Sequence, residues 1–301
     1  MASPASHDQE RRPSDGRGHR IPRQRTGRRR KDQQVRRRGS VKRGWTTWTT
    51  AIVDPRVTAI IPIVIDVLNV QKSMEHHFEA YGFWAPAIKD YVNHKITERM
   101  DTPGHDEILR ICDPFSYRER LTMPKYIVNA SGDEFFVPDS SQFYFDELPA
   151  PKYLRYVPNA NHSLKGTDAV FSIHAFYDAI LKKTPLPQFG WTMEKDGSIT
   201  VTTKDAPKEV NLWQATNPKA RDFRIDSIGK AFTKTTLNSE SEGKYVATVD
   251  KPESGWTAFF VELVYDVGGT FPLKFTTQVS IVPDKLPHSI EEYRQTLRAG
   301  K

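Results

Sequence analysis

Residues 125–133 read Lys-Tyr-Ile-Val-Asn-Ala-Ser-Gly-Asp, an apolar run that stops at a Ser-Gly-Asp turn. Such a run is typical of a buried strand in a parallel sheet. Two comparable runs lie at 57–65 and 152–157, and the segments between the three runs have mostly helical patterns. Alternation of strands and helices predicts an α/β fold, in which a parallel sheet carries helices on both faces.

Two residues with catalytic chemistry follow these runs. Asp133 comes directly after the run at 125–130, and His162 follows the run at 152–157 within an Asn-rich loop. In parallel sheets, functional residues gather at the carboxyl ends of the strands. The order Asp then His matches the acid and the base of an α/β-hydrolase triad, in which the acid orients the imidazole. We therefore predict Asp133 and His162 as acid and base.

Other interpretations of these residues stay open. An Asp after a strand is usually a turn former, and a His in an Asn-rich loop is usually a surface residue; their pairing at successive strand ends favours the catalytic interpretation. Asp139 and Asp66 are fallback acids. Asp66 is the weaker of the two because it lies one strand earlier.

The first 38 residues differ from the rest of the 301-residue chain. They contain thirteen Lys or Arg against four Asp or Glu, no aromatic residue and almost no aliphatic ones. Without apolar periodicity they cannot form a packed core, so we predict a basic, disordered segment. A nucleic-acid-binding arm is a less favoured interpretation. The segment lacks the apolar region of a secretory signal, and the sequence assigns no compartment.

Changes in composition predict the further boundaries. After a Pro-Leu-Pro linker, short β-type runs with turns such as Asp196-Gly197 indicate an all-β domain, and about seven strands suggest an Ig-like sandwich. We expect the C-terminal half of a hydrolase-like domain at 39–184 with a helical cap region at 71–120, a linker at 185–190, a β-sandwich at 191–284 and a tail at 285–301.

Five strings in this order resemble the PhoPQ-activated pathogenicity-related protein family over about residues 42–284. The resemblance implies an α/β-hydrolase fold with a Ser-Asp-His site, poorly defined substrates and, for many members, export. The strings are Lys-Arg-Gly-Trp-Thr-Thr-Trp at 42–48, Asp-Pro-Arg-Val at 54–57, Val-Ile-Asp-Val-Leu-Asn at 64–69, Gly-Asp-Glu-Phe-Phe-Val-Pro-Asp-Ser at 132–140 and Val-Pro-Asn-Ala-Asn-His-Ser-Leu at 157–164.

The resemblance also points to a missing nucleophile. In the family, Gly-Ala-Ser precedes the Lys-Arg-Gly-Trp string, and its serine lies on the turn between a strand and a helix. Here that position is Val41, and Ser40 lies one residue too early to substitute for it. The family's N-terminal half is absent, so we expect an N-terminally truncated chain.

We hypothesise that residues from about Arg11 to Val41 are translated in the wrong frame. A frame shifted by one base can encode, with suitable synonymous codons, an amphipathic helix, a strand and Gly-Ala-Ser leading into Lys42. The nucleotide sequence across these codons tests the hypothesis, which fails if that frame does not encode the peptide.

The sequence thus predicts a serine-hydrolase-like protein that acts on an ester or amide and is impaired because Val41 replaces the nucleophile. The alternative is a non-catalytic binding or scaffold protein with the same fold. We expect no cofactor, no nucleic-acid partner and no transmembrane segment; the substrate and the oligomeric state are left open.

Histidines at 76, 77, 94 and 105 with Glu75 fit no zinc pattern, and a solvated helix face is favoured for them. Cys112, the single cysteine, is expected in the core.

Overall fold

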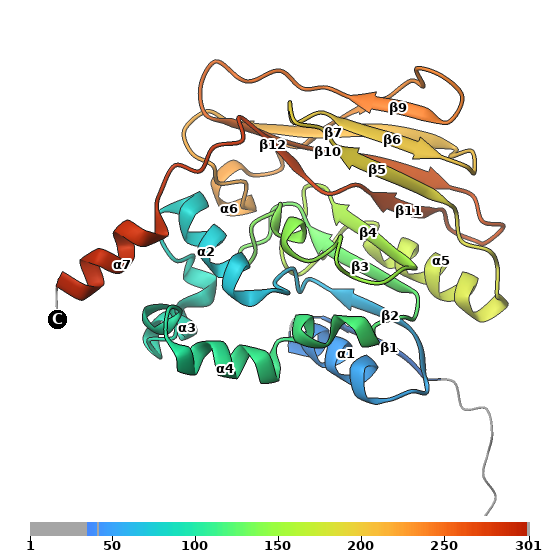
Figure 1. Ribbon diagram of the computed structural model, residues 1–301. Helices are drawn as coiled ribbons and strands as arrows, with labels where there is room; N and C mark the ends of the chain where they lie inside the picture. The colour runs from blue at the N-terminus through green and yellow to red at the C-terminus, as the bar shows by residue number, and fades with distance from the viewer. Residues whose placement is uncertain (1–34, 41, 300–301) are drawn as a thin grey trace, which may run out of the picture. The chain divides into compact units, whose positions relative to one another are not determined.

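A parallel sheet of four strands forms one half of the protein. The computed structural model describes residues 35–40 and 42–299, all of which belong to one compact unit. The order of the strands in the sheet is their order in the chain, which confirms the predicted α/β arrangement (Figure 1). The strands are β1 (Val35–Ser40), β2 (Val57–Ile63), β3 (Lys125–Ala130) and β4 (Lys152–Val157).

Helices cover both faces of this sheet because side chains alternate along its strands. Ile127 of β3 lies in one hydrophobic cluster with Trp48 of α1 (Lys42–Val53). Tyr126, its neighbour on β3, points to the other face and stacks on Phe176 of α5 (Ala169–Lys182), with 5.0 Å between the ring centroids. Each fully buried aromatic side chain contributes ~2–3 kcal/mol to the free energy of unfolding.

Gly44 allows α1 to approach the sheet closely. A Cβ atom at this position would lie 2.6 Å from Cγ2 of Ile65 and 3.2 Å from the carbonyl oxygen of Ile63. Ile63 is the last residue of β2, and Ile65 lies two residues after it. Any larger residue would therefore push the start of α1 away from the sheet.

The segment between β2 and β3 is helical. Two expectations within it are wrong. His76 and His77 are buried rather than solvated, because α2 packs between the loop after β3 and the C-terminal helix. Cys112 is exposed, because α4 buries none of its residues. The helices are α2 (Val70–Tyr81), η1 (Pro86–Ile88), α3 (Lys89–Asn93), η2 (Thr97–Arg99), α4 (Pro103–Cys112) and η3 (Pro114–Arg120), and η4 (Ser140–Phe143) follows β3.

Two antiparallel sheets form the C-terminal part, and the Ig-like connection of their strands stays a prediction. One sheet has the order β5-β6-β9, and the other has the order β11-β10-β7-β8 with β12 beside β10. The predicted turn at Asp196-Gly197 joins β5 to β6. The elements are β5 (Phe189–Met193), β6 (Ile199–Thr203), β7 (Glu209–Asn217), α6 (Ile225–Ile228), β8 (Thr233–Thr236), β9 (Lys244–Ala247), β10 (Trp256–Tyr265), β11 (Leu273–Thr276) and β12 (Ser280–Val282).

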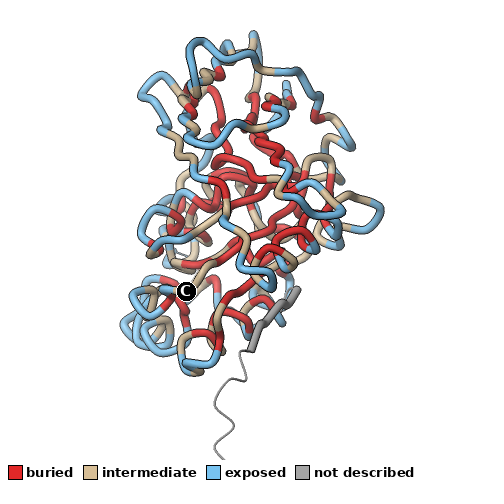
Figure 2. The backbone as a smooth tube through the Cα atoms, turned by 90° about the vertical axis from the view of Figure 1, so that its right-hand side faces the viewer, coloured by how far each residue is buried: buried red, intermediate tan, exposed pale blue. Residues whose placement is uncertain are grey.

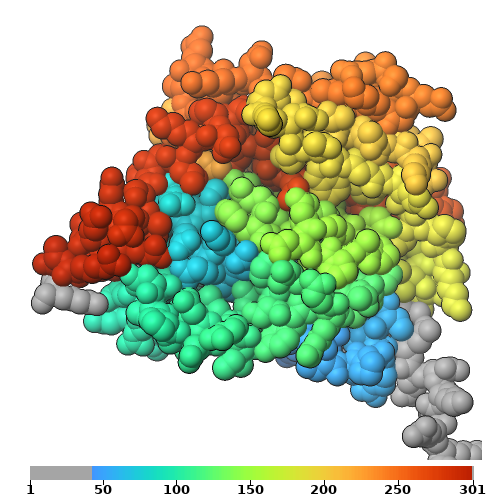
Figure 3. Space-filling model, viewed as in Figure 1, coloured from blue at the N-terminus to red at the C-terminus, as the bar shows by residue number. Residues whose placement is uncertain are grey.

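The C-terminal strands share their core with the parallel sheet, so the expected linker at 185–190 does not separate two bodies. Strand β5 already begins within it. On β10, Phe259 belongs to a cluster with strand β6, whereas Phe260 contacts Tyr156 of β4, with 6.2 Å between the ring centroids. Buried residues fill the middle of the molecule (Figure 2), and on the face shown in Figure 3 the yellow C-terminal atoms lie directly against the green atoms of the parallel-sheet half. Strand β10 is therefore buried on both faces.

Both chain ends depart from the predictions. Residues 35–38, expected to be disordered, belong to β1, because backbone hydrogen bonds to β2 require no particular side chains. The expected tail contains α7 (Ile290–Ala299), whose Tyr293 ring lies 4.4 Å from that of Phe78 on α2. Residues 1–34 of the predicted disordered segment lie outside the described residues. Within the described ranges, each helix is too short or too polar to traverse a bilayer.

Candidate functional site

The loops after β3 and β4 bring Asp133 and His162 together. His162 Nδ1 lies 2.8 Å from Oδ2 and 2.9 Å from Oδ1 of Asp133. The Asp133 side chain is 3% exposed and that of His162 is 11% exposed. A carboxylate only accepts hydrogen bonds, so Nδ1 carries the proton and donates it to Asp133. The pair predicted from the sequence is therefore a buried, directly bonded pair.

Backbone contacts fix the position of the Asp133 carboxylate. Its Oδ1 accepts a hydrogen bond from the amide of Phe135 at 2.8 Å. The preceding Gly132 donates to the carbonyl of Ala160 and accepts from the amide of Ile225, both at 3.0 Å. A Cβ atom on Gly132 would lie 3.1 Å from each of these two partners. The residue before the acid is thus confined between two segments of backbone.

The loop that carries His162 is bonded to the loop that carries Asp133. The Asn159 amide donates to Ser131 Oγ at 3.1 Å, and the His162 amide donates to Glu134 Oε2 at 2.8 Å. Asn159 has a φ of 56°, in the left-handed region that Asn tolerates. Its side chain also exchanges two hydrogen bonds with the backbone of Phe232. These ties hold the imidazole in place relative to the carboxylate.

The second ring nitrogen of His162 is buried without a partner. Nε2 has no hydrogen bond to any residue in the part of the chain that the structure describes. The ring packs against Phe135, with 4.2 Å between centroids, and more loosely against Phe136 at 5.9 Å. With the proton on Nδ1, the lone pair of Nε2 is free to accept a proton from a bound group.

Burial and the neighbouring His162 shift the pKa of Asp133 in opposite directions. Burial raises the pKa of its carboxyl, while the hydrogen bond and the charge of His162 lower it, and the net direction is upward. The ionised carboxylate therefore depends on its histidine partner. This is the mutual dependence expected of an acid that serves mainly to orient an imidazole.

Neither fallback acid bonds to His162. Asp139 accepts hydrogen bonds from His76 Nε2 at 2.9 Å and from Arg221 Nη2 at 2.6 Å. Burial alone would raise the pKa of Asp139, but the charges of Arg221 and His76 outweigh it and lower the pKa. Arg221 was not predictable from the sequence, since nothing near it in the chain distinguishes it from arginines that lie on the surface.

Asp66 forms a separate buried group. Its two carboxylate oxygens accept hydrogen bonds from the hydroxyls of Tyr144 and Tyr156, each at 2.6 Å. Burial raises the pKa of Asp66 to about 7, although both tyrosine hydroxyls counteract this. Asp66 thus supports the loops beneath the site rather than the histidine.

Comparison with known proteins is consistent with this arrangement. The model of the PhoPQ-activated pathogenicity-related protein family matches residues 35–224, a span that includes β1, Asp133 and His162. The chain belongs to this family. The resemblance identified in the five sequence strings is confirmed.

A curated relative is Autocrine proliferation repressor protein A of Dictyostelium discoideum, 41% identical over 283 residues. The match covers 85% of this chain but only 57% of the relative, so the chain spans little more than half of that protein's length.

Two solved structures match about half of the chain. Acetyl xylan esterase 1 from Thermoanaerobacterium sp. matches with a TM-score of 0.35 and 14% identity, over 50% of this chain and 44% of the esterase. The α/β hydrolase GrgF from Penicillium sp. matches with a TM-score of 0.31 and 13% identity, over 50% of this chain and 63% of that protein.

The position predicted for the nucleophile falls in the sequence between β1 and α1. Ser40 is the last residue of β1 and α1 begins at Lys42, whereas Val41 lies outside the described residues. The carboxyl end of β1 is at the same edge of the parallel sheet as those of β3 and β4. Ser40, at the end of β1, is therefore on the edge that also carries Asp133 and His162.

The described residues contain no metal-binding cluster. Among residues 35–40 and 42–299, no three His, Cys, Asp or Glu side chains are grouped so that they could hold a metal ion. The histidines of α2 instead serve other partners: His76 bonds Asp139, and His77 Nε2 accepts from the amide of Ala85 at 3.1 Å. Burial lowers the pKa of His77 to about 3, so it is a neutral structural residue.

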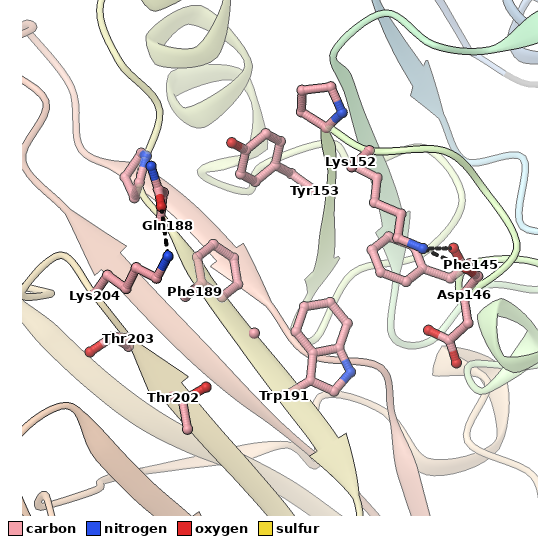
Figure 4. A pocket seen from close by; sticks show the side chains of 14 residues that line it. Phe145, Asp146, Lys152, Tyr153, Gln188, Phe189, Trp191, Thr202, Thr203 and Lys204 are labelled. Atoms are coloured by element: carbon pink, nitrogen blue, oxygen red, sulfur yellow. Dashed lines mark hydrogen bonds between the residues drawn. The ribbon is translucent and has the colours of Figure 1, made fainter.

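A groove of about 740 Å³ lies elsewhere on the protein. Its walls include Lys152 and Tyr153 at the start of β4 and Phe189 and Trp191 of β5 (Figure 4). His162 follows the opposite, carboxyl end of β4. The groove is therefore at the other end of the sheet and is not part of the Asp133–His162 site.

Proposed function

We propose that this chain carries the acid and base of a serine-hydrolase-like site, Asp133 and His162, built for acyl transfer from an ester or amide. The observation that carries the proposal is the bond from His162 Nδ1 to buried Asp133, with Nε2 left free of partners among the described residues. This is the geometry a general base needs toward a nucleophile. The fold and the family membership support the same class of chemistry.

The nucleophile that would complete the site is replaced by Val41. A serine there would donate its proton to His162 Nε2 as its oxygen attacks the substrate carbonyl carbon. Asp133 would hold the Nδ1 proton and stabilise the imidazolium that forms. The valine side chain has no hydroxyl, so the covalent route is lost; removing the serine of a comparable triad costs ~10⁶-fold in turnover. The chain is therefore a catalytically impaired family member.

Restoring the hydroxyl tests this proposal. We expect the chain and its Val41→Ala variant to leave p-nitrophenyl acetate intact, and Val41→Ser to hydrolyse it at least ~100-fold faster than Val41→Ala. Val41→Ala is the matched control because it shortens the side chain without adding an oxygen. The gain must disappear in Val41→Ser combined with His162→Gln. A folded Val41→Ser variant without turnover would refute the hydrolase proposal. If instead the unmodified chain hydrolyses the ester and Ser40→Ala abolishes this activity, the nucleophile is Ser40.

A non-catalytic binding or scaffold role is the second candidate. Val41 favours it, as does the name of the Dictyostelium relative, which describes repression of proliferation and not a chemical step. Purified chain added to proliferating Dictyostelium cells would then slow their growth, and His162→Gln would act equally well. Loss of that effect in His162→Gln alone would speak against a purely scaffolding role.

A further inference from the structure

A buried ion cluster joins three distant segments beside the candidate site. Asp139 lies in the loop after β3, His76 on α2, and Arg221 in the segment after β7. Arg221 Nη2 donates to Asp139 Oδ2 at 2.6 Å, and His76 Nε2 lies 2.9 Å from Oδ1. All three side chains are at most 6% exposed. Charges this deeply buried are tolerated only when they are paired, so the cluster fixes where these segments lie.

The same C-terminal segment holds the Asp133 loop a second time. Four residues after Arg221, the amide of Ile225 donates to the carbonyl of Gly132 at 3.0 Å. Gly132 immediately precedes Asp133, and Asp139 lies six residues after Asp133. Residues 221–225 therefore hold the acid loop on both sides of Asp133.

The holding segment is itself rigidly folded. The side chain of Asn217 donates to the carbonyl of Asp222 at 2.7 Å and accepts from the Lys219 amide at 3.0 Å. Asp222 in turn binds Arg224 through two side-chain hydrogen bonds, at 2.9 and 2.6 Å. A segment restrained in this way can impose its position on the loop that it contacts.

We propose that Arg221 is a positioning residue for the Asp133–His162 pair, an assignment that rests on the proposed function. Without its guanidinium, the carboxylate of Asp139 loses its permanent cationic partner in a buried environment. The loop then moves to hydrate that carboxylate and carries Asp133 away from His162 Nδ1. A displacement of about 1 Å at a reacting group can lower turnover ~100-fold.

The proton on His162 Nδ1 gives a direct test that does not need activity. A hydrogen bond to a carboxylate moves its ¹H NMR resonance far downfield, and the resonance is assigned by its absence in His162→Gln. We expect Arg221→Met to shift or abolish it. The control is Arg155→Met, which removes another fully buried guanidinium, paired with Asp168 at 2.5 Å, and should leave the resonance in place.

The outcomes separate this inference from the proposed function. An unmodified chain with no resonance assignable to His162 would remove the basis of both. Two results would overturn the role of Arg221 but not the proposed function. One is a resonance that is present in the unmodified chain and unchanged in Arg221→Met. The other is a resonance that Arg155→Met shifts as much as Arg221→Met does. If Arg221→Met does not fold, Arg221→Lys provides the test: its single ammonium keeps the charge but not the fork that reaches Asp139 and His76, so an unshifted resonance again overturns the inference.

Activity supplies a second readout in the Val41→Ser background. We expect Arg221→Met to lower kcat ~100-fold with little change in KM, and Arg155→Met to leave both unchanged. A positioning residue affects the chemical step, whereas general destabilisation would lower the amount of active protein in both variants.

Discussion

Asp66 makes the stability of the protein depend on pH, and Asp66→Asn should remove this dependence. The folded pKa of Asp66 is about 7, against 3.8 for the exposed group, because burial disfavours the carboxylate. A raised carboxyl pKa means that the folded protein binds the proton more tightly than the unfolded chain does. The stabilisation is therefore complete below about pH 4 and is lost as the pH rises through 7; a shift of about three units corresponds to ~4 kcal/mol.

Urea unfolding of the chain and of Asp66→Asn between pH 4 and pH 8 measures the effect. The difference between the two free energies of unfolding isolates Asp66, because the other groups titrate in both proteins. An amide retains an acceptor for one tyrosine and a donor for the other, so the variant should fold. We expect the difference to fall by up to ~4 kcal/mol as the pH rises. A difference that stays constant over this range would refute the argument.

Asp139→Asn is the control with the opposite sign. The pKa of Asp139 is lowered in the folded protein, so its stabilisation is present above the unfolded pKa and is lost as the pH falls. The difference between the chain and Asp139→Asn should therefore rise with pH below about pH 4, so the urea series for this pair is extended to more acidic solutions.

Two further substitutions test the packing. Gly132→Ala should destabilise the protein by ~1–3 kcal/mol in urea unfolding, because its Cβ would press on two backbone atoms 3.1 Å away. Gly190→Ala, whose Cβ would meet nothing within 4 Å, should be neutral or slightly stabilising, and equal losses would contradict the geometry. Trp48→Ala should cost ~3–5 kcal/mol, since this side chain is fully buried under the sheet. Val53→Ala, on the same helix but 74% exposed, should change the melting temperature little.

The strands at 57–63, 125–130 and 152–157 were predictable because their side chains are buried on both faces of the sheet. Continuous apolar runs are the direct result of that burial. The pairing of Asp133 and His162 followed from them, since parallel strands end at one edge whatever the sequence between them. Local pattern was therefore enough for the part of the site that the sheet itself positions.

Strand β1 was not predictable by the same reasoning. Its sequence, Val-Arg-Arg-Arg-Gly-Ser, has neither a continuous apolar run nor alternation. It pairs with β2 through backbone groups, with one register shift between Val35 and Arg36, and side-chain pattern is no guide to such pairing. Sequence patterns predict strands that bury their side chains, whereas β1 is a strand because its backbone pairs with that of β2.

The buried histidines and Arg221 were missed for a different reason. Arg221 meets Asp139 across 82 residues and His76 across 145 residues of chain. Taken alone, a histidine pair on a polar helix resembles a solvated face, and an arginine in a loop resembles a surface charge. Only the packing of α2 and of the C-terminal segment against the acid loop makes burial of these groups favourable.

The candidate site belongs to both halves of the protein rather than to the parallel sheet alone. The sheet supplies the strand ends, and C-terminal residues supply further contacts that fix the two loops: Arg221 at Asp139, Ile225 at Gly132 and Phe232 at Asn159. Strand β10 is buried on one face against β4, so separating the halves would expose aromatic residues on both. A mutation far along the chain, among residues 221–232, can therefore displace His162 without contacting it.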